Sequence, residues 1–373
     1  MKWSRKNFVK GIAISTIAAP FAIRVLSGES VAQEQATGNL ISDKQYQWKM
    51  VTTWPPNFPI LEAACDRFSD MLRKMSSGRL DIRVYGGGAL VPALECFDAV
   101  RSGAAEMASG AAYYWAGKVP AAQFFATVPF GMNAQQMNTW LTSSGGLTLW
   151  RDLYADFNLI PFAFGNTGVQ MGGWFNREIN SIADFKGLKM RMPGLGGKVL
   201  ARAGGTPVLL AGSEIYTGLE RGVIDATEWI GPFHDYQIGF HQIAKYYYTP
   251  GWHEPGTVLE LIVNKKAYEA LPVDLQEMIR VASDAINHWV LLELEAKNAE
   301  YLARIKQEKE VEIRQFPSEV LAQLQDYTRD ILAEFTAQDA YAKKVYDSLM
   351  TYRKQAIGWS ALTEKVFYND IQG

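Results

Sequence analysis

The feature that most constrains the fold of this chain is a regular alternation of strand-like and helix-like segments. Residues 47–53 and 80–84 each place apolar side chains on one face, which is typical of strands. Helical periodicity follows each of them, at residues 58–76 and 91–102, and the same rhythm returns within residues 169–229. Such alternation predicts an α/β protein with mixed sheets flanked by helices.

The length of the chain and the order of its strands predict two lobes and long C-terminal helices. A chain of 373 residues is long enough to bury more than one core. We expect lobe 1 to comprise residues 33–164 plus about 255–310, and lobe 2 to comprise residues 165–254 plus about 311–340. A last helix is expected within residues 341–373. Ligands of such folds bind at strand carboxyl ends that face the cleft between lobes.

The N-terminal segment has the order of features found in export signals. Four basic residues within the first ten precede an uncharged run at residues 11–23, and a small-x-small sequence ends at Ala32. The uncharged run is too short to span a membrane. Residues 4–10 resemble a twin-arginine signal in which Lys6 replaces the second arginine, which leaves the export route open. We therefore expect residues 1–32 to be a cleaved, Tat-like signal peptide and the mature protein to reside in the periplasm.

The charge of the mature chain argues against two classes of partner. The sequence has 37 basic and 39 acidic residues, and the expected leader holds five and one of them, so 32 and 38 remain, a formal charge of −6. No basic block is left in this part of the sequence. We therefore expect no binding to nucleic acid or to an anionic membrane surface.

Residues suited to covalent chemistry form no recognised pattern. The sequence lacks GxSxG, HExxH, CxxC and P-loop motifs, which lowers the expectation of an enzyme without excluding an exported one. Cys65 and Cys96 fall in predicted helices, which favours buried thiols over a disulfide. Four histidines lack metal-ligand spacing and are expected to be structural: His234, His241, His253 and His288.

Arg191 is a candidate for binding a carboxylate. It stands near the end of a predicted strand at residues 188–192, just before Pro193 and Gly194. A guanidinium offers a planar fork that matches a carboxylate with two parallel hydrogen bonds. The alternative is an ordinary strand-end arginine in a surface ion pair.

Glu228 is a candidate for holding a cation. It ends another predicted strand, and a buried carboxylate is costly unless a cation or donors offset its charge. Gln170 supplies an amide oxygen from a neighbouring predicted strand, and hard cations prefer such oxygen ligands. The alternative for Glu228 is a helix-capping or surface acid.

With these residues in view, the chain resembles the substrate-binding subunits of tripartite ATP-independent periplasmic (TRAP) transporters of the DctP-like group. The motifs that carry the resemblance span most of the chain: GALVP at residues 88–92, NTG at 166–168, MRMPG at 190–194 and EIYTGLERGVIDA at 214–226. The resemblance implies a two-lobed periplasmic-binding-protein architecture. It also implies a solute receptor, not an enzyme, which passes a small carboxylate to the TRAP transporter membrane subunits.

Further segments are similar to the branch of that family which binds 2-oxo monocarboxylates such as pyruvate together with a metal cation, Na⁺ or Ca²⁺. They are YYW at residues 113–115, VPFG at 128–131, QMGGWF at 170–175, EW at 228–229 and PGWHEPG at 250–256. The branch includes a lactate binder that uses calcium, so a 2-hydroxy acid or another organic acid is the alternative ligand. A dicarboxylate would require a second basic residue in the cleft, and the sequence offers no clear candidate for one.

The same resemblance implies a role for individual residues. The implied substrate-binding residues are Arg191, Gln170, Tyr113 and Asn166. The implied metal ligands are Glu228, Trp229 through its backbone oxygen, Glu254 and Gln170. In this branch a C-terminal helix is exchanged between two subunits, so the resemblance also implies a homodimer formed through residues 341–373.

Overall fold

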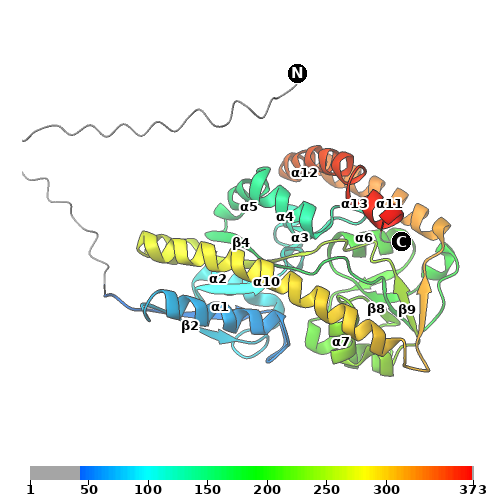
Figure 1. Ribbon diagram of the computed structural model, residues 1–373, viewed down its shortest axis with the longest axis horizontal. Helices are drawn as coiled ribbons and strands as arrows, with labels where there is room; N and C mark the ends of the chain where they lie inside the picture. The colour runs from blue at the N-terminus through cyan, green and yellow to red at the C-terminus, as the bar shows by residue number, and fades with distance from the viewer. Residues whose placement is uncertain (1–42, 372–373) are drawn as a thin grey trace, which may run out of the picture. The chain divides into compact units, whose positions relative to one another are not determined.

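The strands form two sheets in the computed structural model, which describes residues 43–371 (Figure 1). The expected signal peptide at residues 1–32 lies outside the described residues. The first sheet contains β1 (Tyr46–Thr52), β2 (Leu80–Tyr85), β3 (Met107–Gly110), β4 (Leu159–Asn166) and β10 (Val258–Asn264), in the order β2-β1-β3-β10-β4. The pairs β1–β2 and β1–β3 are parallel, whereas β10 runs antiparallel to both β3 and β4.

The second sheet has shorter strands. It contains β5 (Gly173–Phe175), β6 (Lys189–Arg191), β7 (Thr206–Val208), β8 (Ala226–Thr227), β9 (Tyr246–Thr249) and β11 (Glu312–Gln315), in the order β11-β9-β5-β8-β6-β7. The pairs β6–β8, β6–β7 and β9–β11 are parallel, and β5 is antiparallel to its neighbours β8 and β9. Two mixed sheets flanked by helices are the predicted fold class.

Burial along the strands follows the sequence pattern. In β2, Leu80 and Ile82 are buried while Asp81 and Arg83 alternate with them, as expected for a strand with one solvated face. Every residue of β10 is buried because β10 lies between β3 and β4 with helices over the sheet.

The helices cover the sheets through apolar stripes. The sequence predicts a buried face at Leu61, Cys65, Phe68, Leu72 and Met75. In α1 (Leu61–Met75) the first four are buried, but Met75 at the end of the helix is exposed. Cys65 and Cys96 are buried free thiols, as the sequence favoured. The other helices are α2 (Cys96–Ser102), α3 (Gln123–Ala126), α4 (Ala134–Ser143), α5 (Gly146–Ala155), α6 (Gly194–Arg202), α7 (Gly212–Glu220), α8 (Pro232–Ile238), α9 (Lys265–Glu269), α10 (Val273–Ile305), α11 (Ser318–Gln338), α12 (Ala340–Ser360) and α13 (Glu364–Val366). Short 3-10 turns lie at Ala93–Glu95, Ala112–Trp115, Pro120–Ala122, Ile182–Phe185 and Phe240–Gln242, and a π-helical turn at Phe367–Ile371 ends the described chain.

The long helix α10 links parts of the molecule that carry different sheets. It packs against α1 and β4, which belong to the first sheet and its cover, and against α8, which follows β8 of the second sheet. Figure 1 shows α10 as one continuous yellow helix running past both regions. Among the described helices, none combines the length and apolar character that a membrane span requires.

Two short crossings between the sheets run side by side. Residues 167–172 lead from β4 to β5, and residues 250–257 lead from β9 to β10. Backbone hydrogen bonds join them, from Thr167 N to Thr257 O at 2.9 Å and from Gln170 N to Glu254 O at 3.2 Å. We call these two crossings the paired connecting segments. The lobe boundaries that we predicted follow the same crossings and stay a prediction.

Several elements differ in extent from the sequence-based expectation. The predicted strands that contain Gln170 and end at Glu228, which we expected at residues 169–175 and 224–229, are shorter in the structure and correspond to β5 and β8. The backbone beside them is bonded elsewhere; for example, Met171 N donates to Ile230 O at 3.1 Å. Gln170 and Glu228 therefore lie in loops. The expected C-terminal helix is also not continuous, since α12 ends at Ser360 and short helical turns follow.

Candidate functional site

The pairing of β6 with β8 places two predicted site residues together. These strands are parallel, with Arg191 aligned to Thr227, so their carboxyl ends lie at the same edge of the sheet. Glu228 follows Thr227 directly, and its backbone N–H donates to Arg191 O at 3.3 Å. The two candidate side chains thus leave the sheet at adjacent positions.

Arg191 and Glu228 form a buried ion pair. Both side chains are 1% exposed, and Arg191 Nη1 contacts Glu228 Oε1. Arg191 Nη2 donates to the Tyr114 hydroxyl at 3.2 Å, and the guanidinium lies over the Trp229 ring at 5.0 Å. Burial opposes the charge of Arg191, but the adjacent Glu228 carboxylate and other neighbours raise the pKa of Arg191 above its usual value. Among the described residues, Arg191 Nε has no hydrogen-bond partner.

A small pocket adjoins this ion pair. Its volume is about 10 Å³, close to the minimum of roughly 10–15 Å³ that one water molecule requires. Among the residues that line the pocket, Arg191 is the one with a basic side chain. The lining residues come from both sheets and from the paired connecting segments: Trp54, Tyr113, Tyr114, Thr167, Gln170, Arg191, Trp229, Ile230 and Leu259.

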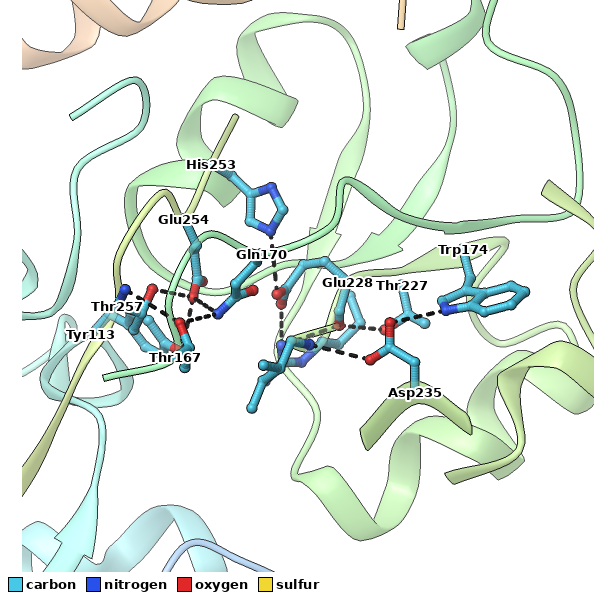
Figure 2. A network of polar contacts seen from close by, with 12 residues as sticks. Tyr113, Thr167, Gln170, Trp174, Thr227, Glu228, Asp235, His253, Glu254 and Thr257 are labelled. Carbon is cyan, nitrogen blue, oxygen red and sulfur yellow. Dashed lines mark hydrogen bonds and ion pairs between the residues drawn. The ribbon is translucent and has the colours of Figure 1, made fainter. Parts of the chain in front are cut away.

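Glu254 is the centre of a hydrogen-bond network beside the pocket (Figure 2). Its Oε2 accepts from Thr257 Oγ1 at 2.6 Å, from Gln170 Nε2 at 2.8 Å and from the Tyr113 hydroxyl at 3.5 Å. Burial, reinforced by the charge of Glu228, raises the pKa of Glu254 to about 7. The network holds two side chains that line the pocket, Tyr113 and Gln170, in fixed directions.

This network decides which end of the Gln170 amide is available. Gln170 Nε2 donates to Glu254 and also to Thr167 Oγ1 at 3.1 Å, so the amide nitrogen is fully used. Gln170 Oε1 is buried and accepts no hydrogen bond from the described part of the chain, and the same holds for Glu228 Oε2. Two buried oxygen acceptors without donors fit a hard cation, which prefers amide and carboxylate oxygens.

Of the two remaining predicted site residues, Trp229 lines the pocket and Asn166 does not. Trp229 lines the pocket with its ring and is 5% exposed. Asn166 does not line the pocket, because its amide bonds to the paired connecting segments, with Oδ1 accepting from Gly168 N at 2.9 Å and Nδ2 donating to Gly256 O at 3.4 Å. A direct ligand role for Asn166 gains no support from this geometry.

Sequence reasoning missed four residues of the site. Tyr114, Thr167 and Thr257 contact Arg191, Gln170 and Glu254, respectively. Tyr114 and Thr167 lie within the quoted segments YYW and NTG, and Thr257 directly follows PGWHEPG, but none of the three was assigned a role of its own. His253, which we expected to be structural, is wholly buried with its Nε2 3.4 Å from Glu228 Oε2. The sequence feature that could have identified His253 as a site residue was its position next to Glu254.

A second buried carboxylate supports the loop that carries Glu228. Asp235 accepts hydrogen bonds from Tyr247 OH at 2.8 Å and from Ile230 N at 3.3 Å. It also accepts one from Trp174 Nε1 at 3.1 Å (Figure 2). Burial raises the pKa of Asp235 to about 7. Asp235 therefore fixes the backbone two residues after Glu228.

Comparisons with known proteins identify the family of this chain. The model of the bacterial extracellular solute-binding proteins, family 7 (DctP), matches residues 50–339. A monocarboxylate 2-oxoacid-binding periplasmic protein of Nostoc sp. PCC 7120 is 41% identical over 323 residues, which covers 87% of this chain and 88% of that protein.

Two solved structures are similar over the same extent. They are TRAP periplasmic solute-binding proteins, one from Pseudoalteromonas atlantica T6c with bound sodium and pyruvate and one from Colwellia psychrerythraea with bound calcium and pyruvate. Each is 42% identical to this chain, with a TM-score of 0.86 over 88% of this chain and 100% of the other.

Proposed function

This chain belongs to the bacterial extracellular solute-binding proteins of family 7, and on that premise we propose that it binds a small 2-oxo monocarboxylate of the pyruvate kind together with Na⁺ or Ca²⁺. It is a TRAP solute receptor and not an enzyme. The residues around Arg191 supply binding groups for a carboxylate, and transport requires no covalent step.

The observation that carries the proposal is the buried Arg191 guanidinium at the pocket. Its Nη2 meets the Tyr114 hydroxyl, its Nε has no partner among the described residues, and its face is covered by Trp229. A carboxylate that approaches this fork gains two charge-assisted hydrogen bonds in a site shielded from water. With one basic residue in the lining, the pocket favours a monocarboxylate over a dicarboxylate.

The oxygen acceptors near Arg191 support a bound cation. Glu228 Oε2 and Gln170 Oε1 are the two side-chain oxygens that would hold it, and both are buried without donors in residues 43–371. A bound cation would supply positive charge to the carboxylate and C2 oxygens of the acid. We propose roles for Trp229, through its backbone oxygen, and for Glu254 at the same place.

The ion pair between Arg191 and Glu228 couples the two ligands. In this structure Glu228 Oε1 occupies the guanidinium that the acid would use. Arg191 becomes fully available when Glu228 turns toward a cation, so acid and cation should strengthen each other's binding. The pocket of about 10 Å³ is too small for a 2-oxo acid, so entry requires the lobes to separate and then close.

We propose that the mature protein acts in the periplasm, docks on the TRAP membrane subunits and forms a homodimer. In this chain α12 packs on its own α4 and α5. The end of α12 and the segment after it leave large apolar side chains uncovered, with Trp359 66% exposed and Leu362 77% exposed. Exposed apolar groups at this density mark association surfaces, and a second copy of the chain is the occupant that the family resemblance implies.

A panel of acids tests the proposed ligand. The melting temperature of the metal-stripped protein is measured with pyruvate, longer 2-oxo acids, lactate and succinate, each with Na⁺, with Ca²⁺ or with neither. We expect 2-oxo acids with a cation to stabilise most; a ligand at 100 times its Kd adds about 2.7 kcal/mol. Succinate should give no shift.

Three results of these measurements would contradict the proposed ligand or function. A larger shift with succinate than with any 2-oxo acid would overturn the monocarboxylate assignment. A larger shift with lactate would move the ligand to the 2-hydroxy acids and leave the site in place. Steady consumption of an acid by the purified protein would support an enzyme instead.

A further inference from the structure

His253 differs from an ordinary buried histidine. The comparison is His234, which is also wholly buried but whose Nε2 lies 2.7 Å from Pro59 O in a hydrogen bond. Neither ring nitrogen of His253 has a hydrogen-bond partner within residues 43–371. A buried imidazole normally satisfies its polar atoms. Nδ1 has no partner among the described residues in either histidine, so the feature that singles out His253 is its Nε2, which makes no hydrogen bond and faces the Glu228 carboxylate.

The His253 ring is aimed at the candidate cation ligands. Its Nε2 lies 3.4 Å from Glu228 Oε2, an oxygen that also has no hydrogen-bond partner among the described residues. Figure 2 shows the imidazole pointing down onto the Glu228 carboxylate, with Glu254 alongside. The candidate ligand atoms of Glu228, His253 and Glu254 all lie within 4.8 Å of one another, and all three residues are buried.

The surroundings hold the imidazole in this place. The ring packs edge-on against Trp252, with the ring centres 5.5 Å apart. Helix α6 also approaches the side chain so closely that a Cβ at Gly196 would lie 3.1 Å from the His253 Cβ. The side chain is therefore confined beside Glu228.

The donor set of this cluster differs from one made of oxygens alone. Sodium and calcium prefer oxygen ligands, whereas an imidazole nitrogen suits borderline divalent metals such as zinc and cobalt. In tetrahedral coordination at the usual zinc–ligand bond lengths, neighbouring ligand atoms are about 3.4 Å apart. The separation of 3.4 Å between His253 Nε2 and Glu228 Oε2 agrees with that value.

We propose that Glu228, His253 and Glu254 form a mixed carboxylate and imidazole site that accepts a borderline divalent cation together with the acid. The inference rests on the proposed function, because it concerns the same pocket. Because His253 adds a nitrogen ligand, the receptor would take up borderline divalent cations with its ligand, in addition to the hard cations that oxygen ligands hold. The acid would complete the coordination, since a 2-oxo acid offers two oxygens to one metal.

Cobalt binding tests this site directly. Metal-stripped wild-type protein is titrated with Co²⁺ in the presence of pyruvate, and visible absorption and titration calorimetry record binding. We expect one cobalt ion per chain and a nitrogen ligand in the X-ray absorption spectrum of the wild-type complex. His253→Gln should weaken Co²⁺ binding at least about tenfold, the lower limit seen even for residues that only support metal ligands.

Two controls separate this proposal from the proposed function. His288→Gln, at an exposed position on α10, should bind Co²⁺ as the wild type does, and the wild type and His288→Gln should be stabilised equally by pyruvate with Ca²⁺. Unchanged Co²⁺ affinity in His253→Gln, or a cobalt spectrum without nitrogen ligands, would overturn the imidazole site while pyruvate binding stands. If cobalt binds through His253 but pyruvate stabilises the protein with none of the cations, the metal site stands and the proposed acid fails. The spectrum of the wild-type complex decides the matter if the variant does not fold.

Discussion

At the scale of single residues, the Arg191–Glu228 pair ties the stability of the protein to its binding site. Both groups are buried, and each is the charged partner of the other. Removing one member of a buried pair leaves an uncompensated charge, which costs more than the pair itself contributes. The site is therefore a point where folding and ligand binding make opposite demands on one carboxylate.

Arg191→Met is expected to lower the free energy of unfolding by about 3–5 kcal/mol, because the Glu228 carboxylate is left buried without the guanidinium that balances its charge. Chemical denaturation of the ligand-free protein measures the change. Arg202→Met removes an exposed ion pair with Glu334 and should cost about 1 kcal/mol or less. Equal losses in the two variants would contradict the account of the buried pair.

A carboxyl away from the site predicts a pH dependence. Glu260 is wholly buried and accepts hydrogen bonds from Trp115 Nε1 and from Tyr154 OH, and burial raises its pKa from 4.5 to about 7. The folded state keeps a proton there that the unfolded chain releases, so stability falls as the pH rises from about 4.5 to about 7.

Glu260→Gln should remove this contribution, roughly 3 kcal/mol across that range at 1.36 kcal/mol per pKa unit. The variant should therefore lose less stability than the wild type between pH 5 and pH 7 in denaturation experiments. Glu310→Gln at the surface controls for the loss of a charge. An unchanged slope in Glu260→Gln would show that Glu260 does not bind the proton.

The sequence allowed individual site residues to be predicted, but not the contacts between them. Arg191 and Glu228 were predictable as strand-end groups suited to an anion and a cation. Their direct pairing was not, because it depends on the alignment of Arg191 with Thr227 across two strands far apart in the sequence. His253 is not predicted as a site residue by the sequence, since only its surroundings in the fold distinguish its contacts from those of His234.

At the scale of elements, the paired connecting segments position Gln170 and Glu254. Their backbones are bonded to each other, with Gly251 N donating to Gln170 O at 2.9 Å. This close approach requires glycine, because a Cβ at position 251 would overlap the backbone oxygen of Gln170. The sequence predicted longer strands here because it does not reveal which backbone groups pair across the crossings.

Gly251→Ala is expected to push the paired connecting segments apart and lower the free energy of unfolding by about 1–3 kcal/mol. It should also weaken acid binding, since Gln170 shifts with its backbone. Thermal denaturation and calorimetry measure the two effects. Gly117→Ala, where a Cβ meets no atom within 4 Å, should change neither. Normal acid affinity in a destabilised Gly251→Ala protein would show that the segments do not position the site.

At the scale of the whole molecule, the two sheets and their helices were predictable and the arrangement at the C-terminus was not. The alternation of strands and helices is a local pattern that determines the fold class. Whether the last helix covers its own chain or a second one depends on contacts that no local pattern reveals. The structure places α12 on its own chain and leaves the turns after Ser360 exposed.

The homodimer proposal predicts that Trp359→Glu combined with Leu362→Glu yields a monomer at concentrations where the wild type is a dimer, because the charges would be buried in the interface. Light scattering after gel filtration measures the mass. Val273→Glu, at an 80% exposed position at the start of α10, should leave the dimer intact. A monomeric wild-type protein would contradict the proposal.

Calorimetric titration of pyruvate into metal-stripped protein, with and without Ca²⁺, tests the central claim that one guanidinium and one acidic residue bind acid and cation together. We predict strong 1:1 binding to the wild type only when the cation is present. Arg191→Lys, which keeps the charge but loses the planar fork, should bind at least about tenfold more weakly, a change of about 1.4 kcal/mol. Equal pyruvate affinity without any cation, or undiminished affinity in Arg191→Lys, would contradict the account.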